Sequence, residues 1–424
     1  MGNKIKSIIK NEYIYSIVTK FVSVILSLLQ SILVARYLGS ALQGTSSYIA
    51  SVTSIGAIVV TFGMHQAYPY FRKKLGKEAI FKDFISITYV VYSILFILSV
   101  FIGLFFLNTI ELKAAFILIP VYGYDRVISY IALIETPNKR NTWWTIISFI
   151  DVIYVGVLIL FIPKSVGSAI SILAFAEVLK SAVYTVMLKT APSLKKSQWS
   201  LFFKLLKMGF FPVVALLMTT LNYKIDILML KSFDFITKSQ IGIYSIGMTF
   251  ADRVVIIPDT LKGVLASKLS KGADEAEVAR VCRLCFWCSV VICAGLIALG
   301  EPLLNLLYGE EYYGSYDVLL ICSFGSIFIG YFKLIAQYNI VNKMQIRNVL
   351  MLSISIIVNI VLNSILIPKY QLRGAAFASG VGYFLSGAIF IIWFSVANKI
   401  PFNSMFLINK NDIKSIFKSG EKQK

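Results

Sequence analysis

Residues 208–230 read MGFFPVVALLMTTLNYKIDILML, and residues 242–261 read GIYSIGMTFADRVVIIPDTL. Each stretch is long enough to cross a bilayer, because about 20 apolar residues at a rise of about 1.5 Å each span its hydrocarbon core. A charged side chain at that depth costs roughly 2.5–3.5 kcal/mol even on an insertion scale. We therefore expect the charges of this pair to face a protein interior and not lipid: Lys224, Asp226, Asp252 and Arg253.

The composition extends this membrane character to the whole chain. Hydrophobic residues make up 58% of the 424, charged residues 15%, and the mean hydropathy is +0.78, which is outside the range of soluble domains. None of the apolar stretches shows the strict alternation of a barrel strand. The sequence predicts an all-α integral membrane protein with twelve spans, near residues 14–37, 42–66, 84–107, 114–134, 142–162, 167–188, 208–230, 242–261, 281–299, 315–338, 349–367 and 375–394.

The positive charge is arranged by connection. Counted from residues 1–20 onward, alternate connections hold 29 Lys and Arg, against 7 in the connections between them. Cytoplasmic loops carry such an excess, so both termini are expected in the cytoplasm. The net charge of +20 thus sets the orientation, and it does not indicate a nucleic-acid partner.

A basic stretch around residues 189–207 separates the first six expected spans from the last six. We expect residues 1–200 to form an N-terminal six-helix bundle. Residues 201–424 would form a C-terminal six-helix bundle with a cytoplasmic tail.

Further charges fall inside spans of the first half: Asp125 and Arg126 in the fourth, Asp151 in the fifth, and Glu177 and Lys180 in the sixth. Two interpretations stay open for each of them. The charges form ion pairs that hold helices together, or they line a cavity.

Polar stripes raise the same choice on the first two spans. Small hydroxyl residues at steps of three and four share one helix face, and they serve either close packing or cavity lining. The stripes consist of Lys20, Ser23, Ser27 and Gln30, and of Ser47, Ser51, Ser54, Thr61 and His65.

Three patches resemble a known family. The turn 35-ARYLGS-40 is followed by Gly44 and Tyr48, the middle patch 223-YKIDILML-230 leads into 242-GIYS-245, and the third pairs Asn359 and Asn363 with 366-LIPKY-370. They are similar to O-antigen or capsule repeat-unit flippases of the Wzx type, in the multidrug/oligosaccharidyl-lipid/polysaccharide exporter superfamily. Where that family usually has Gly after the Tyr of the third patch, this chain has Gln371.

The resemblance implies a MATE-like fold of two six-helix bundles around a central cavity. It also implies that undecaprenyl-pyrophosphate-linked oligosaccharide repeat units are moved from the inner to the outer leaflet of a bacterial cytoplasmic (inner) membrane, by alternating access coupled to H⁺ or Na⁺. The expected partners are that lipid-linked oligosaccharide, membrane lipids, and the polymerase and chain-length proteins of O-antigen and lipopolysaccharide biosynthesis. No enzymatic activity, cofactor or metal is expected.

A pyrophosphate crossing the bilayer needs cations at depth, and six bases are candidates for binding it. They are Arg126, Arg253, Lys180, Lys224, Lys333 and Arg36, of which Arg126 and Arg253 lie nearest mid-span. Five acids either bind the coupling ion or balance these bases: Asp226, Asp252, Asp151, Glu177 and Asp125.

Other functions fit less well. The chain has no Gly-x4-Gly-Lys-Ser/Thr phosphate loop, which argues against an ATP-driven pump. A multidrug or cation antiporter of the same superfamily is an alternative, but embedded bases disfavour cationic substrates. A polyprenyl-linked polysaccharide polymerase would need a sizeable outer loop, and the longest outer connection here is residues 300–314.

Overall fold

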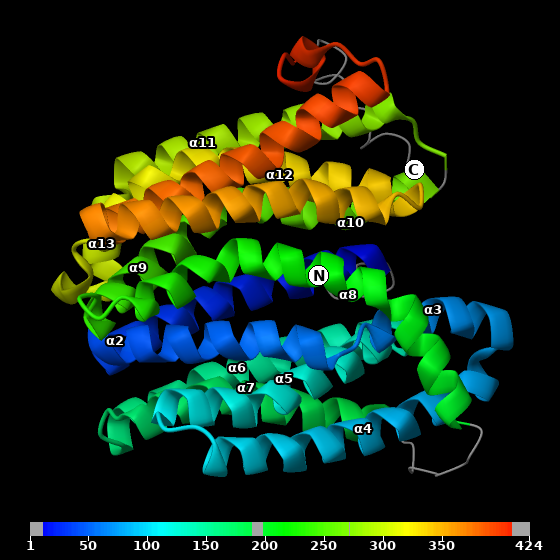
Figure 1. The fold of residues 1–424 in the computed structure, drawn as a ribbon, viewed down its shortest axis with the longest axis horizontal. Coiled ribbons are helices and arrows are strands. Elements are labelled where there is room, and N and C mark those ends of the chain that lie inside the picture. The colour runs from blue at the N-terminus through cyan, green and yellow to red at the C-terminus, as the bar shows by residue number, and fades with distance from the viewer. Residues whose placement is uncertain (1–11, 189–197, 271, 409–424) are drawn as a thin grey trace, which may run out of the picture. The chain divides into compact units, whose positions relative to one another are not determined.

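The computed structural model describes residues 12–188, 198–270 and 272–408, and all secondary structure within these ranges is helical. Ten helices in the described ranges are long and apolar enough to cross a membrane (Figure 1). The chain is therefore a multi-pass membrane protein. Both ends of the chain, whose location we expect to be cytoplasmic, lie outside the described residues.

The chain divides into two units. Unit 1 comprises Met1–Leu217 with Thr237–Gly242, and unit 2 comprises Met218–Ile236 with Ile243–Lys424. The helix that links them, α8, runs continuously through residues 200 and 201, where the sequence led us to expect the boundary. That boundary stays a prediction.

Unit 1 is built around α5, which packs against α2, α4, α6 and α7. Its core includes the fully buried Tyr68, Phe84, Ile128 and Tyr184. Its helices are α2 (Glu12–Val60), α3 (Met64–Leu75), α4 (Lys77–Phe105), α5 (Ile110–Glu135), α6 (Pro137–Phe161), α7 (Val166–Leu188) and the first part of α8 (Gln198–Ser232).

In unit 2 the central helix is α12, which packs against α10, α11 and α13. Of the most apolar 18-residue stretch of this helix, 72% is buried inside the protein. The elements are the end of α8, then most of α9 (Lys238–Ala251), η1 (Asp252–Val255), α10 (Ile256–Ser270), α11 (Glu275–Tyr308), η2 (Glu310–Tyr312), α12 (Ser315–Val341), α13 (Gln345–Ala397) and η3 (Phe402–Met405).

Two of these helices each cover the ranges of two expected spans. Within α2 the helical geometry is interrupted at Gly39, where φ is 72° and ψ is 171°. Within α13 the interruption is at Gln371, where φ is 50° and ψ is −124°. Glycine adopts both conformations without strain, whereas at Gln371, which carries a Cβ, the backbone is strained. The sequence-predicted number of twelve spans stays a prediction.

The eighth expected span is not one regular helix. It consists of most of α9, the 3-10 turn η1 and the start of α10. Pro258 has no N–H to donate to the carbonyl of Val254 four residues earlier. The Ser289 hydroxyl of α11 donates to that carbonyl instead, at 3.1 Å, so the carbonyl keeps a hydrogen bond at the break.

Candidate functional site

Two adjoining cavities lie among the membrane helices of unit 1. The basic cavity has a volume of about 350 Å³ and is lined by Asp125, Arg126, Ser129 and Arg140, among others. The hydroxyl cavity has a volume of about 260 Å³ and is lined by Ser23, Ser27, Gln30, Ser148 and Asp151, among others. The two share four wall residues, Tyr122, Trp144, Glu177 and Lys180.

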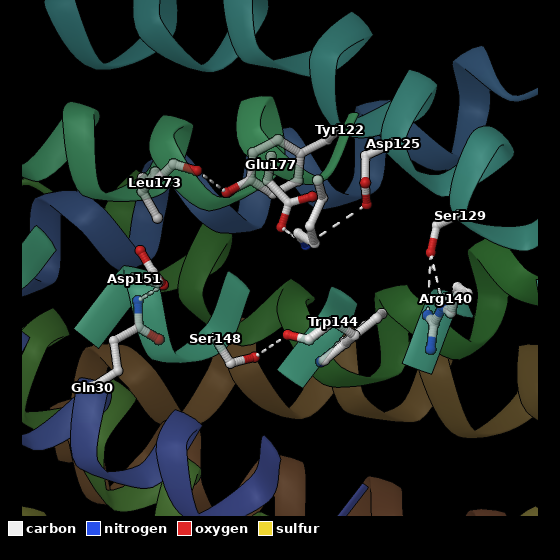
Figure 2. Close-up of polar contacts among 11 residues, drawn as sticks. Gln30, Tyr122, Asp125, Ser129, Arg140, Trp144, Ser148, Asp151, Leu173 and Glu177 are labelled. Carbon is white, nitrogen blue, oxygen red and sulfur yellow. Dashed lines mark hydrogen bonds and ion pairs between the residues drawn. The ribbon is translucent and has the colours of Figure 1, made fainter. Parts of the chain in front are cut away.

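Helical periodicity explains why these side chains meet. On α6 the residues Arg140, Trp144, Ser148 and Asp151 follow one another at steps of four, four and three, so they share one face. The lining residues of α2, α5 and α7 recur at similar steps. Figure 2 shows Asp125 and Glu177 on one side of the space, with the α6 side chains on the other.

Lys180 forms the centre of the charge cluster. Its Nζ lies 2.5 Å from Oε1 of Glu177 and 3.7 Å from Oδ2 of Asp125, and its side chain is 13% exposed. Asp125 therefore pairs across to α7, and not with its sequence neighbour Arg126. At this point of the membrane interior, one ammonium thus pairs with two carboxylates.

The two arginines of the basic cavity lack carboxylate partners. Arg140 donates from Nη2 and Nε to Ser129 Oγ at 3.1 and 3.4 Å, and its guanidinium lies 3.9 Å from the Trp144 ring centroid. Arg126 makes no hydrogen bond or ion pair with any residue in the described ranges. Both are positioned to accept an anion in the cavity without first breaking a salt bridge.

Asp151 occupies the far wall, in the hydroxyl cavity. Gln30 donates from Nε2 to Asp151 Oδ2 at 2.5 Å, and the carboxylate is 5% exposed. The Oδ1 atoms of Asp151 and of Asp125 have no hydrogen-bond donor among the residues described. Each acid thus keeps an acceptor available inside the membrane.

The polar stripes of α2 divide between the two interpretations. Ser23, Ser27, Gln30 and Ser54 line the cavities. Ser51, farther along α2, and Thr61, directly after the end of α2, are fully buried. Their hydroxyls donate to the backbone carbonyls of Ser47 and Ile58, so they serve packing. His65 is 3% exposed and packs edge-on against Tyr130.

Unit 2 holds a second set of the sequence-predicted residues. Lys333 Nζ lies 2.6 Å from Asp259 Oδ2 and 5.2 Å from the Tyr223 ring centroid. Lys224 is partly exposed, and no ion pair joins it to the described chain. In η1, Asp252 is exposed, and Arg253 is partly buried with an unsatisfied Nε.

Asp226 lies in a small buried network. It is 1% exposed and accepts hydrogen bonds at Oδ2 from the hydroxyls of Tyr244 and Ser379. One turn earlier on α8, Asn222 donates to Ser386 Oγ at 3.2 Å. Asp226 Oδ1 has no donor in the described ranges, so packing alone does not account for every polar atom here.

The structure thus brings five of the eleven sequence-predicted residues together in unit 1: Asp125, Arg126, Asp151, Glu177 and Lys180. The sixth candidate in this unit, Arg36, is exposed near the break at Gly39 and lines neither cavity. The other five candidates belong to unit 2.

Sequence reasoning missed Arg140 and Trp144. Arg140 was counted as a loop residue that sets orientation, although it stands within α6 (Pro137–Phe161). The signal that could have found both was their spacing, because they extend the polar face of Ser148 and Asp151 by two helical steps.

Among the described residues, no group of three or more His, Cys, Asp or Glu is arranged to hold a metal ion. Four of the five cysteines are buried, and all five are unpaired thiols.

Comparison with known sequences adds independent information. The family described as "Polysaccharide biosynthesis protein" matches residues 9–258. The capsular polysaccharide biosynthesis protein CapF of Staphylococcus aureus is 31% identical over 169 residues, which are 35% of this chain and 39% of CapF. The uncharacterized membrane protein MJ1068 of Methanocaldococcus jannaschii is 33% identical over 94 residues, or 22% of this chain and 18% of that protein. The aligned stretches span less than half of either relative.

Solved structures resemble the chain over nearly its full length. The lipid II flippase MurJ, in an inward closed conformation, superposes with a TM-score of 0.71 at 19% identity, covering 96% of this chain and 93% of MurJ. An inward-facing multidrug resistance MATE family transporter of the MOP superfamily gives 0.69 at 10% identity, covering 90% and 95%. At such identities the likeness concerns the fold, and it confirms the expected MATE-like architecture.

Proposed function

The chain belongs to the polysaccharide biosynthesis protein family, and from that premise we propose that it flips a lipid-linked oligosaccharide across the membrane. The substrate we assign is an undecaprenyl-pyrophosphate-linked repeat unit, carried from the inner to the outer leaflet of a bacterial cytoplasmic membrane. The family, the MATE-like fold and the membrane-embedded cavities all support a transporter and not an enzyme.

The observation that carries this proposal is the basic cavity with its two uncommitted guanidinium groups. A pyrophosphate is a polyanion, and the planar guanidinium of arginine binds phosphate oxygens with paired N–H donors in a fixed fork. Arg126 has no partner in the described chain, and Arg140 is held by neutral groups and an aromatic ring. An incoming pyrophosphate would gain charge-assisted bonds to both without displacing a carboxylate.

The nearby acids keep the cavity from being a permanent anion trap. Asp125, Glu177 and Asp151 carry as many formal charges as Arg126, Arg140 and Lys180. A carrier has to release its cargo on the other side, so binding must be reversible. Carboxylates close to the bases weaken anion binding by like-charge repulsion and make release easier.

Coupling to H⁺ or Na⁺ is part of the same proposal. Of the acids that retain an unsatisfied oxygen, we assign Asp125 in unit 1 and Asp226 in unit 2 to the coupling ion, with the exposed Asp252 as a third candidate. For unit 2 we assign Arg253, Lys224 and Lys333 to the cargo path. Lys333 would have to leave its partner Asp259 to take that role.

In the cell this activity places the protein beside the polymerase and chain-length proteins that use the flipped repeat unit. The CapF relationship favours a capsular polysaccharide as the end product over an O-antigen. The alternative function, a multidrug antiporter, is supported only by a likeness of fold at 10% identity.

A complementation experiment tests the proposal. Deletion of the gene in its host should remove surface polysaccharide and leave lipid-linked repeat units in the inner leaflet. The wild-type gene and the variant Arg373→Ala, which breaks an exposed ion pair with Asp317, should restore export, whereas Arg126→Ala should not. Unchanged polysaccharide in the deletion strain, with altered sensitivity to cationic drugs, would contradict the proposal.

A further inference from the structure

The hydroxyl cavity has a polar wall that pyrophosphate binding does not require. Two helices, α2 and α6, contribute hydroxyl, amide and carboxylate groups to it, from Ser23, Ser27, Gln30, Ser148 and Asp151. Of its charged lining groups only Lys180 is basic, and that ammonium is already paired with Glu177 at 2.5 Å. Such a wall suits a neutral ligand with many hydroxyl groups better than a second anion.

Asp151 gives this wall a strong acceptor. Its Oδ2 is fixed by Gln30 at 2.5 Å, which orients the carboxylate, while Oδ1 has no donor among the described residues. The group is 5% exposed, and an unsatisfied buried carboxylate oxygen is costly unless a ligand supplies a donor. A sugar hydroxyl is a donor of the right kind, because a hydrogen bond to a charged acceptor is about twice as strong as a neutral one.

Trp144 and Tyr122 stand where the two cavities adjoin, since both line each of them. The Tyr122 hydroxyl is fixed on the Leu173 carbonyl at 2.9 Å, so its ring position is set. The Trp144 ring carries Arg140 at 3.9 Å and Lys180 at 5.3 Å from its centroid. Since these cations already lie over the Trp144 ring, the two aromatic side chains serve as apolar wall beside the hydroxyl-binding groups.

From these contacts we propose that the hydroxyl cavity is the subsite for the first sugar of the substrate, with Asp151 and Gln30 binding its hydroxyls and with Trp144 and Tyr122 lining the space around it. The inference rests on the proposed function, because it places the sugar next to a pyrophosphate in the basic cavity. The cavity volume of about 260 Å³ is below the usual size of a pocket for a drug-sized ligand. It therefore admits a single sugar ring and not an oligosaccharide. The remaining sugars must lie outside this cavity.

The test compares two substrates in proteoliposomes that contain the purified full-length chain. One is undecaprenyl pyrophosphate itself, and the other is undecaprenyl-pyrophosphate-linked N-acetylglucosamine. The variants are Asp151→Asn, which keeps the side-chain size, and Ser27→Ala, a small truncation on α2. Asp317→Asn, at an exposed ion pair, is the matched control.

The subsite predicts a selective loss. Asp151→Asn should slow the sugar-bearing lipid about ten- to a hundredfold and Ser27→Ala a few-fold, while movement of the sugar-free pyrophosphate and the behaviour of Asp317→Asn stay at the wild-type level. If Asp151→Asn does not fold, the test is the ratio of the transport rates of the two substrates in Ser27→Ala, compared with the same ratio in the wild type.

Equal slowing of both substrates in these variants would overturn the subsite and leave the proposed function standing. It would place Asp151 among the coupling groups if the ion dependence changes with it, or in packing if it does not. Undiminished movement of both substrates would also overturn the subsite. If the wild type moves neither substrate, the proposed function fails and the subsite fails with it.

Discussion

Replacement of Lys180 by methionine tests how the charge cluster of unit 1 is held. The change keeps an unbranched side chain of similar length and removes the ammonium that lies 2.5 Å from Glu177 and 3.7 Å from Asp125. The side chains of these two acids are only 19% and 9% exposed. Removal of one member of a buried ion pair costs about 3–5 kcal/mol, because the remaining charge is left without compensation.

The expected cost lies near the lower end, at about 3 kcal/mol, since the cavity admits water and Arg126 and Arg140 stand nearby. The assay is thermal denaturation of the purified protein in detergent, read as the folded fraction that survives heating. Arg373→Met is the matched control. Its side chain is 69% exposed where it meets Asp317, so it should change stability by no more than about 1 kcal/mol.

Neutralising the partners should reverse the loss. In the triple variant Lys180→Met, Asp125→Asn, Glu177→Gln the uncompensated charges are gone, and most of the stability should return. A Lys180→Met protein as stable as the Arg373→Met control would refute this reasoning. So would a triple variant that melts no higher than Lys180→Met alone.

Three further substitutions probe the frame around the site, each read by the same thermal denaturation. Gln371→Gly should stabilise the protein by about 1 kcal/mol, because glycine accepts φ of 50° without strain. A loss of stability would contradict the claim that the backbone at Gln371 is strained. Gly325→Ala should cost at least about 2 kcal/mol, since its Cβ would lie 2.1 Å from the Gly380 carbonyl oxygen, whereas Gly295→Ala meets nothing within 4 Å and should be neutral or stabilising. Ser289→Ala should cost about 1–3 kcal/mol by leaving the carbonyl at the η1 break without a donor, and an unchanged melting temperature would show that water replaces the hydroxyl.

Much of the fold follows from the sequence because the bilayer imposes a simple rule. Apolar length predicted the helices, and all ten membrane-length helices of the described ranges fall on expected spans. The breaks were harder to locate. Gly39 and Gln371 lie where turns were expected, but the 3-10 segment at Asp252 depends on a hydroxyl from a distant helix, which local sequence does not reveal.

The site was predicted in part for a similar reason. A charged residue inside an apolar span is conspicuous, so Asp125, Arg126 and Lys180 were identified as candidates, but their pairing was not. The structure pairs Asp125 with Lys180 on α7 and not with its sequence neighbour Arg126. Arg140 escaped notice because it stands at a helix end, where a basic residue usually marks only the cytoplasmic side.

The most direct test is whether the purified chain alone moves a lipid-linked oligosaccharide across a bilayer. Proteoliposomes would carry a labelled undecaprenyl-pyrophosphate-linked oligosaccharide in both leaflets, and a reagent that cannot cross the membrane would modify only the outward-facing sugar. Wild-type protein should make the inner pool accessible as well, and Arg126→Ala at equal abundance should leave that pool protected as in protein-free vesicles. Protection of the inner pool in wild-type vesicles, across a range of H⁺ and Na⁺ gradients, would contradict the account.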